Sequence, residues 1–95
     1  MDKSGIDTNL TALFFREDED TIIAACPTLD ISTCGKTLEE ARKNFTELVE
    51  LFFEEATNMG TLDQVLADCG WKKYNNKYFE PQLIATETER VKISA

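Results

Sequence analysis

The side chains best suited to chemistry in this sequence are carboxylates, and four of them are consecutive: Glu17, Asp18, Glu19 and Asp20. Carboxylates bind magnesium in nucleases when they converge on one point from separate elements. Consecutive residues of an extended chain alternate in direction, so these four side chains diverge. The tetrad therefore favours a solvated hairpin loop over a metal site.

The sequence has no histidine and three cysteines, Cys26, Cys34 and Cys69. Without histidine, Ser-His and Cys-His nucleophile systems and His-ligated metal sites are excluded. Cys26 and Cys34 can approach each other if their strands pair, but an odd count without CxxC is typical of reduced thiols in a cytoplasm. We expect buried apolar cysteines, no metal, no cofactor and no enzymatic activity.

The formal net charge is -8, and the excess of acidic residues lies within residues 1–60. Such a surface repels a phosphate backbone, whose binding depends on Lys and Arg. It attracts a basic protein partner, or it simply keeps a small domain dispersed in water.

The basic and aromatic residues are concentrated near the C-terminus. The cluster consists of Trp71, Lys72, Lys73, Tyr74, Lys77 and Tyr78. Rings among cations can stack on single-stranded nucleic acid. We favour the alternative that lysines fringe the core aromatic residues, because three lysines bind phosphate weakly.

Three strands are expected in the first third of the chain, at residues 9–16, 21–26 and 29–34. The second strand should end at Pro27, which lacks a backbone donor. The acidic tetrad has no glycine for a tight turn, so it predicts a loose or bulged hairpin connection. In the third strand, Leu29, Ile31 and Thr33 alternate with polar residues and share one buried face.

A helix of about twenty residues should follow the third strand. Thr37 and Glu40 form a capping box, and Gly60 is a natural stop. The inner face holds more large apolar residues than one thin sheet needs, and part of this surplus could serve a homo-oligomer contact. The outer face carries Glu47, Glu50 and Glu54, of which the last two repel each other at i,i+4.

The rest of the chain predicts a second capping box at Thr61–Gln64, a short helix ended by Gly70, and a final edge strand at residues 90–95. A chain of 95 residues is one domain. It shows neither a secretory signal nor a membrane-spanning run. We therefore expect one α+β domain over residues 1–95, with an antiparallel sheet of three or four strands under one long helix.

Residues 27–44 resemble the HicB family of antitoxins, in which a strand-ending proline and leucine precede Gly-x-Thr-x-x-Glu-Ala-x-x-Asn. The matching positions are Pro27, Leu29, Gly35, Thr37, Glu40, Ala41 and Asn44. Leu66, Gly70 and Trp71 also look like the family, so the resemblance covers about residues 9–71. Residues 72–95 form an extended C-terminal segment.

The resemblance implies a partial RNase H-like fold and a partner, the small basic RNA-cleaving HicA toxin. An acidic surface suits that role, because it can compete with RNA phosphate for a cationic face. The hairpin lacks the glycine and aromatic residue often found just after it in the family. The segment after Trp71 is too short for the C-terminal DNA-binding domain of many relatives, so operator binding is not implied.

Two functions remain open from the sequence. The first is a cytoplasmic antitoxin-type protein that neutralises a HicA-type toxin through Glu17, Asp18, Glu19, Asp20, Glu47, Glu50 and Glu54. The second is a solitary, oligomeric HicB-like module with no toxin, dimeric or tetrameric in form. A small nuclease is disfavoured, because Glu40 is explained by its capping role.

Overall fold

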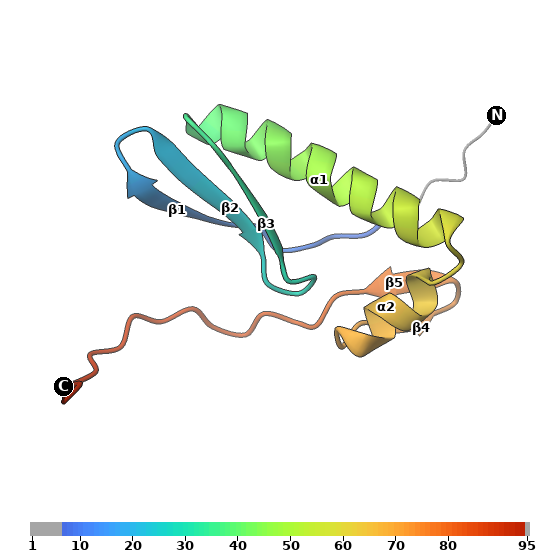
Figure 1. The fold of residues 1–95 in the computed structure, drawn as a ribbon. Helices are drawn as coiled ribbons and strands as arrows, with labels where there is room; N and C mark the ends of the chain where they lie inside the picture. The colour runs from blue at the N-terminus through green and yellow to red at the C-terminus, as the bar shows by residue number, and fades with distance from the viewer. Residues whose placement is uncertain (1–6, 95) are drawn as a thin grey trace.

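The computed structural model of the protein describes residues 7–94. In chain order the elements are β1 (Leu13–Asp18), β2 (Thr21–Cys26), β3 (Ile31–Gly35), α1 (Leu38–Asn58), α2 (Leu62–Asp68), β4 (Lys72–Tyr74) and β5 (Lys77–Phe79). Figure 1 shows α1 lying along one side of a three-stranded sheet, with α2 and the β4–β5 hairpin below its C-terminal end. The α+β class expected from the sequence is confirmed.

The main sheet is an antiparallel meander in the order β1-β2-β3. Apolar and β-branched residues alternate in β2, so Ile22, Ala24 and Cys26 are buried while the residues between them are half-buried. The strand ends at Cys26, directly before Pro27, as predicted. The first strand begins four residues later than expected and continues to Asp18, and the third begins at Ile31 rather than Leu29.

The connection between β2 and β3 explains the later start of β3. Asp30 has a φ of 59°, and its N–H and that of Leu29 donate to the Cys26 carbonyl oxygen. The chain therefore turns through Leu29 before pairing resumes. Leu29 is nevertheless buried in the core, as its place in the alternating pattern predicted.

Helix α1 begins with the capping interactions expected at Thr37. The Thr37 Oγ1 atom accepts from the Glu40 N–H at 3.0 Å, and Glu40 Oε1 accepts from the Lys36 N–H at 2.5 Å. The carboxylate thus binds one residue before the N-cap, not the N-cap itself as in the usual box. Two backbone donors at the helix start are satisfied in this way.

The two halves of α1 cover different parts of the core. In its N-terminal half Ala41 and Phe45 are buried, and the Phe45 ring lies 6.4 Å from that of Phe14 in β1. In its C-terminal half Phe53 meets Trp71 edge to face at 6.2 Å. Much of the apolar surplus on the helix is therefore used within the chain, over α2 and Trp71.

The second capping box predicted at Thr61 does not form. Thr61 makes no side-chain bond to the start of α2, and its hydroxyl points to the Ala56 carbonyl oxygen at 3.5 Å. Gly60 and Gly70 have φ values of 71° and 88° and end the two helices at the predicted stops. Leu62 and Leu66 of α2 are buried against the end of α1.

The β4–β5 hairpin was not expected from the sequence. Asn75 and Asn76 have φ values of 53° and 62°, the two positive angles of a type I′ turn. Lys73 pairs with Tyr78 across this hairpin. Asparagine tolerates this conformation better than most residues, so the Asn-Asn pair was a readable turn signal.

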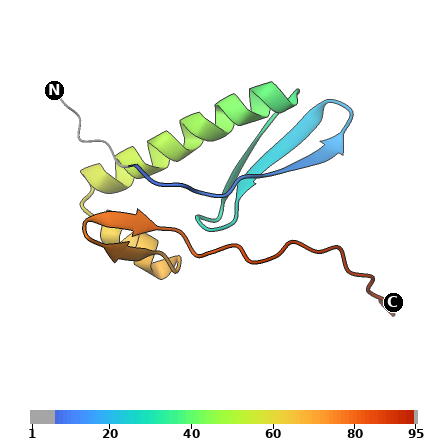
Figure 2. The ribbon, with the colours of Figure 1, turned by 180° about the vertical axis from the view of Figure 1, so that it is seen from behind.

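The final edge strand expected at residues 90–95 is not found. Residues 80–94 carry no strand, all residues from Gln82 to Ser94 are exposed, and Ala95 lies outside the described residues. Figures 1 and 2 show this segment leaving the body as an extended arm. With the arm the molecule measures 51 × 28 × 22 Å. An edge strand needs a neighbour, and residues 82–94 have none among the other described residues of the chain.

Candidate protein-binding surfaces

The acidic tetrad lies at the tip of the β1–β2 hairpin. Glu19 and Asp20 form the turn, and the register shifts between Arg16 and Asp18, so Glu17 is a bulge. The Asp18 carboxylate accepts from the Asp20 N–H at 2.9 Å. All four acidic side chains are exposed. The bulged connection predicted from the sequence is confirmed, and the carboxylates face solvent rather than a common point.

The outer helix row, Glu47, Glu50 and Glu54, is exposed along the middle and second half of α1. The hairpin tip lies beside the N-terminal end of α1 in both ribbon views (Figures 1 and 2). The seven predicted binding residues therefore form two separate acidic areas. We call them the hairpin area (residues 17–20) and the helix area (Glu47, Glu50, Glu54).

Neither acidic area forms a salt bridge within residues 7–94, and the cation beside the hairpin area, Arg16, donates to the Glu19 carbonyl oxygen at 3.5 Å. The salt bridge found in residues 7–94 joins Lys73 to Asp63, neither of which belongs to these areas. The like charges of Glu50 and Glu54 at i,i+4 thus keep their repulsion, which costs a few tenths of a kcal/mol in a helix. A cationic partner would relieve it.

Five of the residues that carry the family resemblance, within residues 35–44, lie at the junction between β3 and α1. A Cβ at Gly35 would lie 2.5 Å from the Ala41 N atom, so only glycine lets the strand pass beneath the helix. Asn44 Nδ2 donates to the Cys34 carbonyl oxygen at 2.8 Å and ties the helix to the strand. With the Thr37–Glu40 cap, these contacts give the motif a structural role in this chain.

The basic-aromatic cluster is divided between the core and the surface. Trp71 is buried, and its Nε1–H donates to the Thr28 carbonyl oxygen at 2.9 Å. Its ring is therefore closed to a nucleic-acid base. Lys72, Tyr74 and Lys77 are exposed on the β4–β5 hairpin. One exposed tyrosine between lysines makes a poor stacking platform, which supports the lysine-fringe interpretation.

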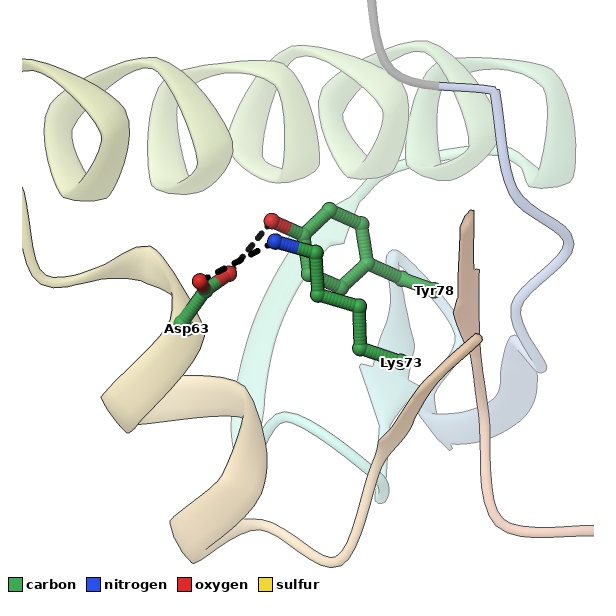
Figure 3. A network of polar contacts seen from close by, with 3 residues as sticks. All are labelled: Asp63, Lys73 and Tyr78. Atoms are coloured by element: carbon green, nitrogen blue, oxygen red, sulfur yellow. Dashed lines mark hydrogen bonds and ion pairs between the residues drawn. The ribbon is translucent and has the colours of Figure 1, made fainter. Parts of the chain in front are cut away.

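Three residues of this region form a polar network (Figure 3). Asp63 Oδ1 accepts from the Tyr78 hydroxyl at 2.5 Å, and Asp63 Oδ2 pairs with Lys73 Nζ at 3.1 Å. The hydrogen bonds from Tyr78 and Lys73 lower the pKa of Asp63. The bonds to Asp63 raise the pKa of Tyr78 and of Lys73. The network fastens the hairpin to α2 and leaves no free nucleophile among these three residues.

Glu80 forms a polar clamp that no sequence pattern predicted. Its carboxylate accepts from the Thr11 N–H at 2.7 Å, the Thr11 hydroxyl at 3.0 Å and the Thr28 hydroxyl at 2.7 Å. These partners are 69 and 52 residues away in sequence, so no local pattern marks them. The clamp fixes the point beside the start of β1 where the C-terminal arm leaves the body.

The face of the sheet turned away from α1 is apolar and uncovered. Cross-strand partners Leu13 and Ala25, and Phe15 and Ile23, alternate with the residues buried under the helix. Phe15 is 56% exposed. We call Leu13, Phe15, Ile23 and Ala25 the open sheet face, because within residues 7–94 no helix or strand packs on it. Large exposed apolar patches mark interaction sites.

The three cysteines are free, and Cys26 and Cys34 are not cross-strand partners in the sheet. Cys26 is buried opposite Ile31, whereas Cys34 is exposed opposite Ile23; Cys69 is half-buried. The expectation of buried cysteines therefore holds for Cys26 and is wrong for Cys34, which lies at the outer strand. In the described part of the chain no three Cys, Asp or Glu side chains gather as a metal site.

No protein-family model, curated protein or solved structure matches this chain. Among the helices of residues 7–94, none combines the length and the apolar character that crossing a bilayer requires. The surfaces that remain as candidates for function are thus the two acidic areas, the open sheet face and the arm.

Proposed function

We propose that this protein is a HicB-like antitoxin-type binding protein that neutralises a small basic HicA-type toxin in the cytoplasm. The observation that supports this most is the pair of exposed acidic areas that form no salt bridge within residues 7–94. Such carboxylates can compete with RNA phosphate for a cationic RNA-binding face. The resemblance at residues 27–44 supplies the class of partner and a partial RNase H-like fold.

The hairpin area is the better docking site of the two. Its four acids lie on a protruding hairpin end, the two-residue turn and the last two residues of β1, that can enter a groove, whereas the helix area lies on a convex cylinder. The apolar open sheet face adjoins the hairpin, because Phe15 and Ile23 lie on the same two strands. Interfaces of stable complexes combine such an apolar centre with a charged rim.

The proposed function requires a small basic protein encoded next to this chain, and the test uses that protein. We expect that protein to cleave RNA, and we expect cleavage to stop when the two proteins are mixed in equal amounts. Replacing Glu17, Glu19 and Asp20 by Gln, Gln and Asn should restore cleavage. A control with the same change in charge, at Glu55, Asp68 and Glu87, should still inhibit.

A second function is favoured by the open sheet face and the arm. The chain is then a solitary HicB-like module, a dimer or tetramer with no toxin, held together by these apolar surfaces. Failure of the neighbouring protein to bind, together with a stable homo-oligomer, would support this alternative and contradict the antitoxin proposal.

A further inference from the structure

The C-terminal arm has the sequence of a strand but lacks a partner strand among the described residues. Leu83, Val91 and Ile93 are 54%, 69% and 81% exposed. Val91 and Ile93 alternate with Arg90 and Lys92, the pattern of a strand with one apolar face. Residues 82–94 span about 43 Å when extended, against about 20 Å for β1. A row of this kind exposed to water is costly unless it is covered.

The two edges of the main sheet are not equivalent. At β3, Asn44 already donates to the Cys34 carbonyl oxygen. That bond shows that the N–H and C=O groups of Cys34 point away from β2, so Ile23 and Cys34 form a non-hydrogen-bonded pair. The N–H and C=O groups of Ile23 therefore point toward β1. Ile23 in turn pairs with Phe15. By alternation, the N–H and C=O groups of Phe14 and Arg16 point to the outer edge of β1.

The outer edge of β1 is open. Within residues 7–94 no side chain bonds to the backbone of Leu13–Asp18, and α1 packs mainly over β2 and β3. Unpaired edges of this kind accept an added strand. The edge is also acidic at its hairpin end, where Glu17 and Asp18 lie, and the apolar end of the arm carries Arg90 and Lys92. Charge therefore matches residues 90–94 to this edge, while Glu87 and Glu89 make the arm neutral as a whole.

We propose that the end of the arm, residues 90–94, adds as a strand to the outer edge of β1 in a second copy of this chain, and that two copies exchange their arms. Val91 and Ile93 then extend the open sheet face of the partner, beside Leu13 and Phe15. The Glu80 clamp holds the base of each arm while the remainder reaches across. This assembly does not depend on the basic partner, and it specifies how the chain self-associates.

The occupant is a second copy because the arm leaves its own sheet. Figures 1 and 2 show residues beyond Pro81 running away from the body, and none from Gln82 to Ser94 is buried against it. In a symmetric exchange, the backbone groups of both arms and of both β1 edges gain hydrogen-bond partners. One chain thus supplies both the strand and the edge that the complex needs.

The test is the molar mass in solution, measured by light scattering during size-exclusion chromatography over a range of concentrations. We expect a dimer for the full chain. Deletion of residues 83–95 keeps the Glu80 clamp and should give a monomer, as should Val91→Asp with Ile93→Asp. The matched control, Thr88→Asp with Ser94→Asp, adds the same charge on the other face of the arm and should remain dimeric.

The edge is tested by Arg16→Pro, which removes the outward N–H and is tolerated on an edge strand. It should give a folded monomer, while Arg16→Thr should stay dimeric. A mixture of the Arg16→Pro chain and the chain lacking residues 83–95 should form a one-to-one complex, since one supplies the arm and the other the edge. A monomeric full chain, a dimer that survives both the deletion and Arg16→Pro, or a mixture without a complex would overturn the proposal.

Discussion

At the scale of single residues, Gly35 decides how closely β3 and α1 approach. Its φ is not in the left-handed region, so the reason for glycine there is space: a Cβ would lie 2.5 Å from Ala41 N and 2.8 Å from the Glu40 carbonyl carbon. We predict that Gly35→Ala lowers the free energy of unfolding by about 1–3 kcal/mol, because the helix must move. Urea denaturation followed by circular dichroism measures this loss.

The matched control for Gly35 is Gly60→Ala. A Cβ at Gly60 would meet no other atom within 4 Å, but the φ of this residue is 71°. The cost of the substitution should come only from backbone conformation, about 1 kcal/mol. An unchanged free energy of unfolding in Gly35→Ala would show that crowding at the β3–α1 junction does not constrain this position.

At the scale of elements, the network of Asp63, Lys73 and Tyr78 makes the attachment of the β4–β5 hairpin depend on pH. The pKa of Asp63 is lowered, so the stabilisation that the Asp63 carboxylate gives to the attached hairpin is complete above the usual pKa of 3.8. This stabilisation is lost as pH falls through the lowered pKa. Because the pKa values of Tyr78 and Lys73 are raised, their contributions are complete below 10.0 and 10.5 and are lost as pH rises through the raised pKa values.

We therefore predict that the hairpin is protected between about pH 4 and pH 10 and loosens outside this window. Amide hydrogen exchange of the hairpin, measured by NMR as a function of pH and corrected for intrinsic exchange, reads this directly. In Asp63→Asn, the protection of the hairpin should no longer fall at low pH. A hairpin whose protection stays constant in wild type below pH 4 would contradict the role given to Asp63.

Local sequence patterns suffice for some of these elements and not for others. Helix α1 and strand β2 were predicted to within a residue or two, because periodicity, the Thr37 cap and Pro27 are local signals. The first and third strands begin later than predicted, because their ends depend on turn geometry. The β4–β5 hairpin could have been predicted from Asn75–Asn76. The Glu80 clamp and the split of α1 between two parts of the core could not, since they arise from long-range contacts.

The same distinction applies to the candidate site. The acidic tetrad was correctly expected at an exposed, bulged hairpin, since consecutive charges and the lack of glycine are local features. Its separation from Glu47, Glu50 and Glu54 follows from how the hairpin lies at one end of α1, which no single segment encodes. The open sheet face was hidden in the sequence for the same reason: alternation marks two faces, but only packing shows which one α1 covers.

At the scale of the whole molecule, the chain presents charge and apolar surface in different places. The acidic areas lie at the hairpin tip and along α1, and the apolar surfaces lie on the open sheet face and the arm. Charge at a rim accelerates encounter, whereas buried apolar contacts lengthen the lifetime of a complex. This division suits a binding protein that meets a cationic partner quickly and holds it.

Attraction of a basic partner by the acidic areas is the property on which the proposed function depends, and stopped-flow association across a salt series tests it most directly. A small basic protein encoded beside this chain, which the proposed function requires, should bind rapidly at low salt, and its association rate should fall about tenfold or more as salt screens the charges. The Glu47, Glu50, Glu54→Gln variant and the Glu17, Glu19→Gln, Asp20→Asn variant separate the helix area from the hairpin area. We expect a slower rate for the hairpin variant and a smaller change for the helix variant. Association rates that are independent of salt and equal in all three proteins would contradict the proposed function.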